Sequence, residues 1–237
     1  MLPDGCNSGR VQELCFPSIQ GPKPMKITLL YDNETHQADL ASDRGFSCII
    51  EVNGNPPLLF DTGASGEILL KNMRSSGITP SSIKEVFLSH NHSDHTGGLP
   101  DLLKERSDIT VFVPPDYVLP RDVKKVVKLE STAPLNEDVY ATGWMNGIEQ
   151  SLFVKSERGI VVIVGCSHAG LKDVLDLAYQ YGDVYGIIGG LHGFNDFGLL
   201  KDLSLVCGCH CTNHKYEIKT LYPEKWIDGG AGRVITL

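Results

Sequence analysis

The stretch VFLSHNHSDHTGGLP, residues 86–100, places three histidines and one aspartate within six positions: His90, His92, Asp94 and His95. Imidazole and carboxylate groups are ligands for zinc, iron and manganese. On an extended segment the side chains of His90 and His92 project to the same side, so both can reach one ion. Asp94 and His95 then begin a turn and can face a second ion. The stretch therefore indicates a metal centre; the alternative is a solvated, histidine-rich turn.

Five apolar runs of the chain each end in a polar residue that can bind a metal or brace a site. These residues are Asp61, His90, His168, His192 and His210. If the runs are strands that point the same way, their polar ends converge at one edge of the sheets, the usual place of a site in layered α/β folds. For His168 the alternative is a cap on the helix that follows it.

A second alternative concerns the string CGCHC at 207–211, which could be a soft metal cluster. Alternation along a strand turns Cys209 and Cys211 away from His210, so buried thiols are favoured over such a cluster. The seven cysteines of the chain lack paired C-x-x-C spacing, and free thiols are expected.

Short apolar runs alternate with amphipathic stretches along the chain, as in folds that mix strands and helices. Strands are predicted at 26–30, 46–52, 57–60, 85–89, 110–113, 150–155, 160–164, 184–188, 203–206 and 233–237. Helices are predicted at 65–75, 80–84, 98–106, 170–181 and 195–201. Early hairpins followed by β-α-β units indicate an α/β (α+β) protein with two mixed sheets covered by helices, rather than one doubly wound parallel sheet.

The N-terminal segment, residues 1–24, has no strand or helix periodicity and is rich in proline and glycine. It is interpreted as a non-native or disordered leader, such as a tag or an upstream start. Residues 25–237 contain no low-complexity linker, so a single domain is predicted there.

The charge of the chain limits its partners. With 21 Lys+Arg against 29 Asp+Glu the net charge is -8, which disfavours non-specific nucleic-acid binding. No apolar run reaches the roughly 18 residues of a membrane span, and no signal peptide is recognisable. We expect a cytoplasmic protein that acts on a small molecule and binds neither nucleic acid nor membrane.

These motifs resemble those of a known family. The string from His90 to His95, followed by TGGL, resembles the H-x-H-x-D-H signature of the metallo-β-lactamase superfamily. FDTG at 60–63, GCSH at 165–168 and CHCT at 209–212 fall where that superfamily keeps its first, third and last motifs. The resemblance implies a four-layer αβ/βα sandwich with one or two metals where its halves meet.

The resemblance also implies two ligand sets. His90, His92 and His168 would bind the first metal, and Asp94, His95 and His210 the second. Asp61 would be an orienting residue that braces the metal-binding loop through hydrogen bonds. Zinc is the favoured ion, with iron, manganese and nickel as alternatives; no organic cofactor is predicted.

The chain departs from the superfamily at the fourth motif. Most members place a bridging aspartate there, whereas this chain reads IIGGLHGF with His192 at that place. With Asp94 as the one carboxylate, two divalent ions leave a formal charge near +3 before hydroxide binds, so the centre should attract a phosphate or carboxylate. His192 is predicted to bind metal or to contact substrate, with capping of the strand as the alternative.

Hydrolysis by a metal-bound hydroxide is the expected chemistry, with a small anionic substrate. Asp94 would accept the proton of water or hold the second ion, and His210 or His192 would bind the anionic oxygen of the substrate. EQSL, GCSHAGL, GGLHGF and CHCT also resemble the branch that contains an archaeal enzyme joining a dihydropterin to ribofuranosylaminobenzene phosphate. A condensing transferase of that type, with pyrophosphate as leaving group, and a catalytically silent metal- or ligand-binding module are the alternatives.

Overall fold

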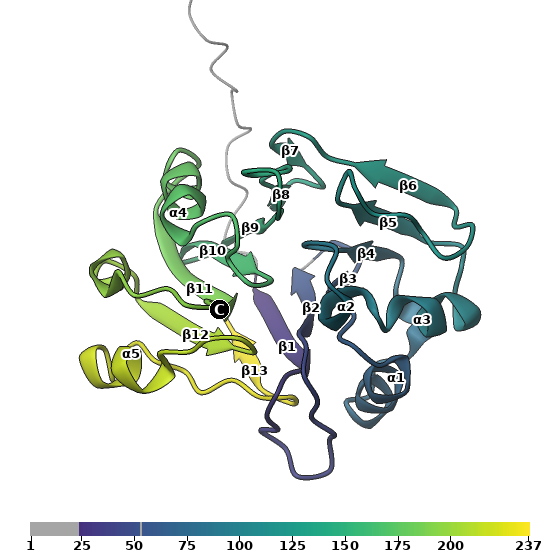
Figure 1. Cartoon of the computed structure of the whole chain (residues 1–237), viewed down its shortest axis with the longest axis horizontal. Helices are drawn as coiled ribbons and strands as arrows, with labels where there is room; N and C mark the ends of the chain where they lie inside the picture. Colours follow the sequence, from purple (N-terminus) through teal and green to yellow (C-terminus); the bar gives the residue numbers. More distant parts are fainter. Residues whose placement is uncertain (1–23, 53) are drawn as a thin grey trace, which may run out of the picture.

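The computed structural model describes residues 24–52 and 54–237, and in this part of the chain the strands form two sheets (Figure 1). The first sheet has the order β13-β1-β2-β3-β4-β5-β6 and the second β12-β11-β10-β9-β8-β7. The strands of the first sheet are β1 (Met25–Tyr31), β2 (Ser47–Val52), β3 (Leu58–Phe60), β4 (Glu85–Phe87), β5 (Thr110–Val113), β6 (Lys125–Lys128) and β13 (Val234–Thr236). Those of the second are β7 (Ala133–Pro134), β8 (Val139–Ala141), β9 (Leu152–Ser156), β10 (Gly159–Val164), β11 (Val184–Gly190) and β12 (Leu205–Cys209).

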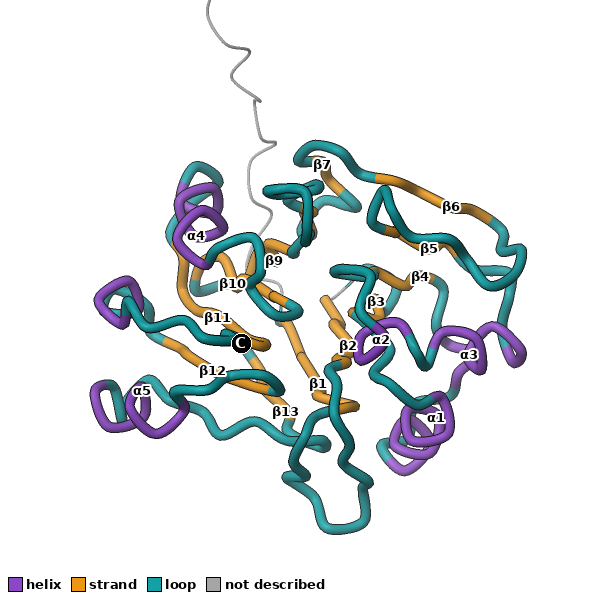
Figure 2. Tube along the Cα trace, viewed as in Figure 1, coloured by secondary structure: helices purple, strands orange, loops and turns teal. Residues whose placement is uncertain are grey.

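Helices lie on opposite sides of the paired sheets, with α1 and α3 on one side and α4 and α5 on the other (Figure 2). The helices are α1 (Gly66–Ser75), α2 (Ser93–Thr96), α3 (Leu99–Glu105), α4 (Leu171–Tyr179) and α5 (Lys215–Leu221). Two short 3-10 turns are η1 (Pro80–Ser82) and η2 (Phe197–Leu200). This is the predicted four-layer αβ/βα sandwich of two mixed sheets.

Each sheet contains a parallel part. In the first sheet β3, β4, β5 and β6 run parallel, and in the second β10, β11 and β12 run parallel. The pairings of β1 with β2 and of β9 with β10 are antiparallel, so both sheets are mixed. Because neighbouring parallel strands end at the same edge, the segments after β3 and β4 begin close together, as do those after β10, β11 and β12.

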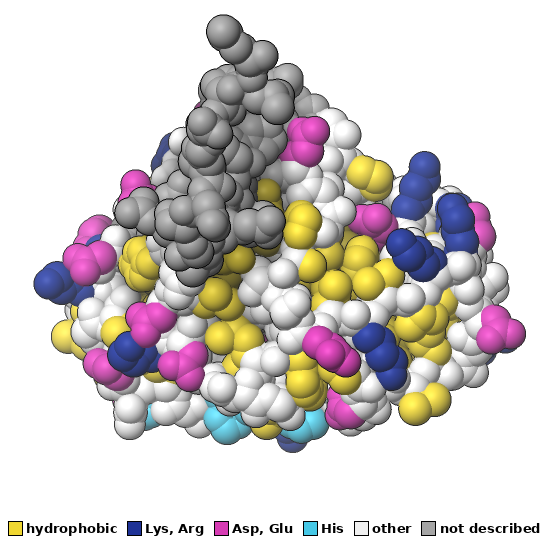
Figure 3. Space-filling model, turned by 90° about the horizontal axis from the view of Figure 1, so that it is seen from above, with side chains coloured by type: hydrophobic (Ala, Val, Ile, Leu, Met, Phe, Trp, Pro, Cys, Tyr) yellow, Lys and Arg dark blue, Asp and Glu magenta, His cyan; other side chains and the backbone are white. Residues whose placement is uncertain are grey.

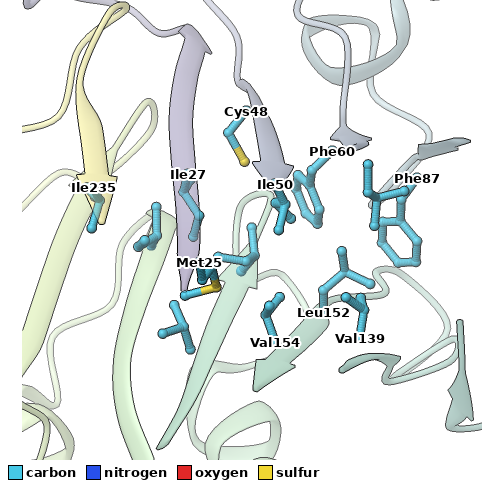
Figure 4. Packing of buried hydrophobic residues seen from close by; sticks show 14 of the residues in the cluster. Met25, Ile27, Cys48, Ile50, Phe60, Phe87, Val139, Leu152, Val154 and Ile235 are labelled. Carbon is cyan, nitrogen blue, oxygen red and sulfur yellow. The ribbon is translucent and has the colours of Figure 1, made fainter. Parts of the chain in front are cut away.

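The core has three layers of apolar side chains. Between the sheets, Ile27, Phe60 and Phe87 pack against Leu152 and Val154 (Figure 4). A second cluster lies between the first sheet and helices α1 and α3, and a third between the second sheet and α4. Strands such as β10 are buried on both faces, which explains why their sequences are continuous apolar runs.

Several predicted elements differ from the observed ones. The strand predicted at 203–206 is β12, which extends from Leu205 to Cys209. The helices predicted at 80–84 and 195–201 are only short 3-10 turns, and β6, β7, β8, α2 and α5 were not predicted. The strand β6 is mostly exposed and α5 buries Ile218 alone, so neither has the apolar pattern on which the predictions depend.

The leader predicted at residues 1–24 lies, apart from Pro24, outside the described residues. The single domain predicted for residues 25–237 stays a prediction. Within the described residues, no helix has the length and apolar character needed to cross a bilayer.

Candidate metal centre

The five polar residues predicted to end apolar runs do follow strands. Asp61 comes directly after β3, and His90 follows β4. His168, His192 and His210 follow the parallel strands β10, β11 and β12. In the space-filling view, histidine side chains are visible along one edge of the molecule (Figure 3).

The first group of donors contains His90, His92 and His168. One ligand atom from each lies within 4.8 Å of the others, and His90 Nε2 is 2.9 Å from His92 Nδ1. Two nitrogens on one tetrahedral zinc ion are separated by about 3.3 Å, given Zn–N bonds of about 2.0–2.1 Å. The separation of the His90 and His92 nitrogens is therefore within a few tenths of an ångström of the value for a shared ion, and the His168 donor lies within 4.8 Å of both.

The second group contains Asp94, His95 and His210, whose donors also lie within 4.8 Å of one another. Asp94 Oδ2 and His210 Nε2 are 3.5 Å apart. The two groups are adjacent, because the ring centroids of His90 and His95 are 4.2 Å apart. The structure thus brings together six of the seven residues predicted as metal ligands, all except His192.

Three of these imidazoles, those of His90, His168 and His210, are kept in the form that binds metal. For His95 the effect of burial is outweighed by Asp61 and Asp94, so its pKa is raised. Burial, followed by the nearby His95 and His92, lowers the pKa of His90. Burial likewise lowers the pKa of His168 to about 4 and that of His210 to about 3. These side chains are neutral at pH 7, and a neutral imidazole has a free nitrogen lone pair for a cation.

Asp61 connects the two groups. Its Oδ1 accepts a hydrogen bond from the Ser89 backbone N–H at 2.7 Å, and its Oδ2 accepts one from the Ser89 hydroxyl at 2.7 Å. Its Oδ2 also lies 2.7 Å from His95 Nδ1, which leaves Nε2 of that ring facing the donors. These contacts hold the ring orientation that ligation requires.

Glu149, part of the EQSL motif, holds the loop after β10. Its Oε1 accepts hydrogen bonds from the N–H groups of Gly165, Cys166 and Ser167, and its Oε2 accepts one from His168 N–H at 2.6 Å. Burial raises the pKa of this carboxyl, while the backbone donors act against that rise. The sequence did not predict this role, because the contacts span 16 to 19 positions along the chain.

Two further residues hold His210. The backbone N–H of His210 donates to Asp32 Oδ1 at 2.9 Å, and its Nδ1 lies 2.8 Å from Asn33 Oδ1. The bond between Asn33 and His210 leaves Nε2 of the ring facing Asp94. The sequence did not predict these contacts, because Asp32 and Asn33 lie just after β1, far from His210 in the chain, and approach it only in the folded structure.

Arg44 is a cation that contacts the second group. Its Nε donates to Asp94 Oδ2 at 3.1 Å, and most of its side chain is exposed. Burial alone raises the pKa of Asp94, but His95 and the other cationic and hydrogen-bonding groups outweigh it, so the pKa is lowered. The exposed guanidinium therefore lies beside the ionised carboxylate of Asp94.

One prediction about the cysteines is wrong. Cys209 is fully buried in the core as expected, but Cys211 does not turn away from His210. The strand β12 ends at Cys209, and His210 has a φ of 45°, so alternation stops there. Cys166, His210 and Cys211 consequently offer donors within 4.8 Å of one another.

His192 is exposed, and its ring centroid lies 5.0 Å from that of His168. Its nitrogens belong to none of the donor groups found among the described residues. Its backbone is in the left-handed region, with a φ of 44°. Metal ligation by His192 stays a prediction, and its position beside His168 suits contact with a substrate.

The sequence of this chain matches the model of a known protein family. The model of the metallo-beta-lactamase superfamily matches residues 43–167, which is more than half of the chain. The chain belongs to the metallo-β-lactamase superfamily. The donor groups around His90 and His95 accordingly lie in a fold that implies divalent metal binding, and their imidazole and carboxylate chemistry fits zinc, iron or manganese.

Relatives within this superfamily cover most of the chain. The 7,8-dihydropterin-6-methyl-4-(beta-D-ribofuranosyl)-aminobenzene-5'-phosphate synthase of Methanocaldococcus jannaschii is 27% identical over 258 residues, covering 80% of this chain and 88% of the synthase. The structure of Tm1679, described as a metal-dependent hydrolase of the beta-lactamase superfamily, has a TM-score of 0.69 at 26% identity and covers 89% of this chain and 98% of that one. YhfI from Bacillus subtilis, a metallo-beta-lactamase fold protein, has a TM-score of 0.67 at 14% identity, covering 91% and 100%, and shows the fold alone.

Proposed function

We propose that this protein is a metal-dependent hydrolase of a small substrate that carries a phosphate or carboxylate group. The observation that carries the proposal is the pair of adjacent donor groups, one around His90 and one around His95. Divalent ions held there would lower the pKa of a bound water towards about 7 and polarise the bond to be broken.

The side chains around these groups support an anionic substrate. The donors include a single carboxylate, that of Asp94, so the charge of two ions would be only partly neutralised. Arg44 adds an exposed cation beside Asp94. We assign His192, exposed next to His168, to hydrogen bonding with the substrate anion, and Asp94 to accepting the proton released from water.

The relation to the archaeal synthase favours a second candidate. Its 27% identity extends over 80% of this chain, so a condensation of a dihydropterin with a ribofuranosylaminobenzene phosphate is an alternative reaction for the same centre. There the cationic site would assist departure of a pyrophosphate group. The two reactions differ in the product to be measured, inorganic pyrophosphate in one and a hydrolysed ester in the other.

Turnover of bis(p-nitrophenyl) phosphate by the purified protein tests the proposal. We expect release of nitrophenolate that stops on chelation and returns when zinc, manganese or ferrous ion is added singly. Protein that binds metal but hydrolyses no ester in a panel of phosphate- and carboxylate-bearing compounds contradicts hydrolysis. Release of pyrophosphate from a dihydropterin pyrophosphate, dependent on the ribofuranosylaminobenzene phosphate, would instead establish the second candidate.

A further inference from the structure

The second donor group has an additional potential ligand in Cys166. Its Sγ lies 3.2 Å from His95 Nε2, the nitrogen that Asp61 leaves available. A sulfur and a nitrogen on one tetrahedral zinc ion are about 3.5 Å apart, from bonds of about 2.3 Å and 2.0–2.1 Å. The observed separation is within a few tenths of an ångström of that value, so an ion can be shared with a small movement.

The sulfur of Cys166 also lies between the two groups. It belongs to a set of donors with His90 and His95, and to another with His210 and Cys211, each set lying within 4.8 Å. It therefore approaches a ligand expected on the first ion and ligands expected on the second. A donor at this position could bridge the two ions. Most members of the superfamily use an aspartate after the strand that corresponds to β11, and this chain has His192 there.

Contacts with Glu149 and Cys211 fix the position of Cys166. The backbone N–H of Cys166 donates to buried Glu149 at 2.9 Å, and Cys211 Sγ lies 3.3 Å from Cys166 Sγ as a hydrogen-bond donor. At Gly190, the last residue of β11, a Cβ would lie 2.7 Å from Cys211 Sγ and 3.3 Å from Cys166 Cα. Glycine at that position thus leaves space for the Cys211 sulfur and for the backbone of Cys166.

We infer that Cys166 supplies a thiolate ligand between the two ions in place of the missing carboxylate, and that Cys211 is a positioning residue that donates its S–H to that sulfur. On metal binding the Cys166 thiol releases its proton to solvent and its sulfur forms a bond to the ion. The thiolate lowers the formal charge of the centre by one. It also selects thiophilic ions such as zinc, cobalt(II) and cadmium over magnesium or manganese.

This inference rests on the metal centre of the proposed function, and cobalt(II) spectroscopy separates the two. The parent is the full chain with Cys6→Ser and Cys15→Ser, so that those two thiols cannot bind cobalt. Cobalt bound by nitrogen and oxygen gives visible d–d bands, and cobalt bound by thiolate adds a sulfur-to-cobalt charge-transfer band in the near ultraviolet. We expect both kinds of band in the parent.

Three further variants show which cysteine supplies the sulfur that binds cobalt. Cys166→Ser should lose the charge-transfer band and keep d–d bands, whereas Cys211→Ala should keep the charge-transfer band at a shifted wavelength. Cys48→Ala, which replaces a buried core thiol, is the matched control and should leave both bands unchanged. Loss of the band in Cys211→Ala but not in Cys166→Ser would overturn the assignment.

The outcomes for the parent distinguish this inference from the proposed function. Visible bands without the charge-transfer band would overturn thiolate ligation and leave the metal centre intact, whereas no cobalt binding at all would contradict both. If Cys166→Ser fails to fold, zinc-edge X-ray absorption of the parent decides the question. It should show a sulfur at about 2.3 Å from zinc, and a shell of nitrogen and oxygen alone would overturn the inference.

Discussion

At the scale of single residues, three buried carboxylates hold the loops that carry the histidines. Asp61, Glu149 and Asp32 have no exposed surface. Asp61 accepts the backbone N–H of Ser89, Glu149 accepts four N–H groups after β10, and Asp32 accepts that of His210. A buried charge is costly unless it is hydrogen-bonded, so each carboxylate and its loop depend on each other.

Glu149→Gln tests this dependence. The amide nitrogen of glutamine would face N–H donors in place of an acceptor oxygen, so we expect a loss of about 1–3 kcal/mol in the free energy of unfolding. Displacement of the His168 loop should also weaken zinc binding by roughly 10–100-fold. Urea unfolding and competition with a zinc indicator measure the two effects. Exposed Glu67→Gln in α1 is the control, and equal behaviour of both variants would contradict the role of Glu149.

A pH dependence follows from His210, whose pKa is lowered by burial from 6.5 to about 3. Between these values the unfolded chain binds a proton that the folded chain does not, so acid favours unfolding. The stability of the metal-free protein should therefore rise with pH across this interval. The contribution is about 1.4 kcal/mol per pH unit for each proton taken up.

Unfolding in denaturant at several pH values, in the presence of a chelator, measures this slope. In His210→Asn the slope should be smaller by up to about 1.4 kcal/mol per pH unit, because the asparagine does not titrate. An unchanged slope would contradict a neutral, buried His210.

At the scale of elements, the ends of strands carry the site, and these ends could be predicted. The apolar runs before Asp61, His90, His168, His192 and His210 are buried on both faces, so their composition alone marked them as strands. The loops after them could not be predicted in the same way. Cys166 and Cys211 lie 45 positions apart in sequence and meet because β10, β11 and β12 are neighbours.

The end of β11 provides a test at this scale. A Cβ on Gly190 would lie 2.4 Å from the Gly165 carbonyl oxygen as well as against Cys211 Sγ. Gly190→Ala should therefore separate the loops after β10 and β11, with a loss of about 1–3 kcal/mol in stability. Zinc affinity should fall with it. Gly193→Ala is the control, since a Cβ there would meet only the Asn213 side chain, at 4.0 Å, and equal effects of the two variants would contradict the close approach at Gly190.

At the scale of the whole molecule, the two sheets are joined by the apolar cluster between them. The donor groups combine residues from both sheets, since His90 follows β4 of the first and His168 follows β10 of the second. The relative position of the sheets therefore sets the geometry of the site. The four-layer arrangement was predictable from the motifs of the superfamily, whereas the packing that fixes this geometry depends on side chains such as Phe60 and Leu152.

Leu152→Ala tests the contribution of this cluster. Leu152 is fully buried between the sheets, so its truncation should cost about 2–5 kcal/mol in the free energy of unfolding. Thermal or urea unfolding measures the loss. Val126→Ala on exposed β6 is the control, where we expect a change within about 0.5 kcal/mol. Similar losses in the two variants would contradict the central place of the cluster.

The zinc content of the purified protein after loading and desalting tests the central claim, which is that the two donor groups form a metal centre. We predict one ion for each group in the wild type, and a lower content when a ligand of either group is removed by His92→Ala or His210→Ala. Exposed His36→Ala should keep the wild-type content. Folded wild-type protein with no zinc above background, or the same content in all of these variants, would contradict the claim.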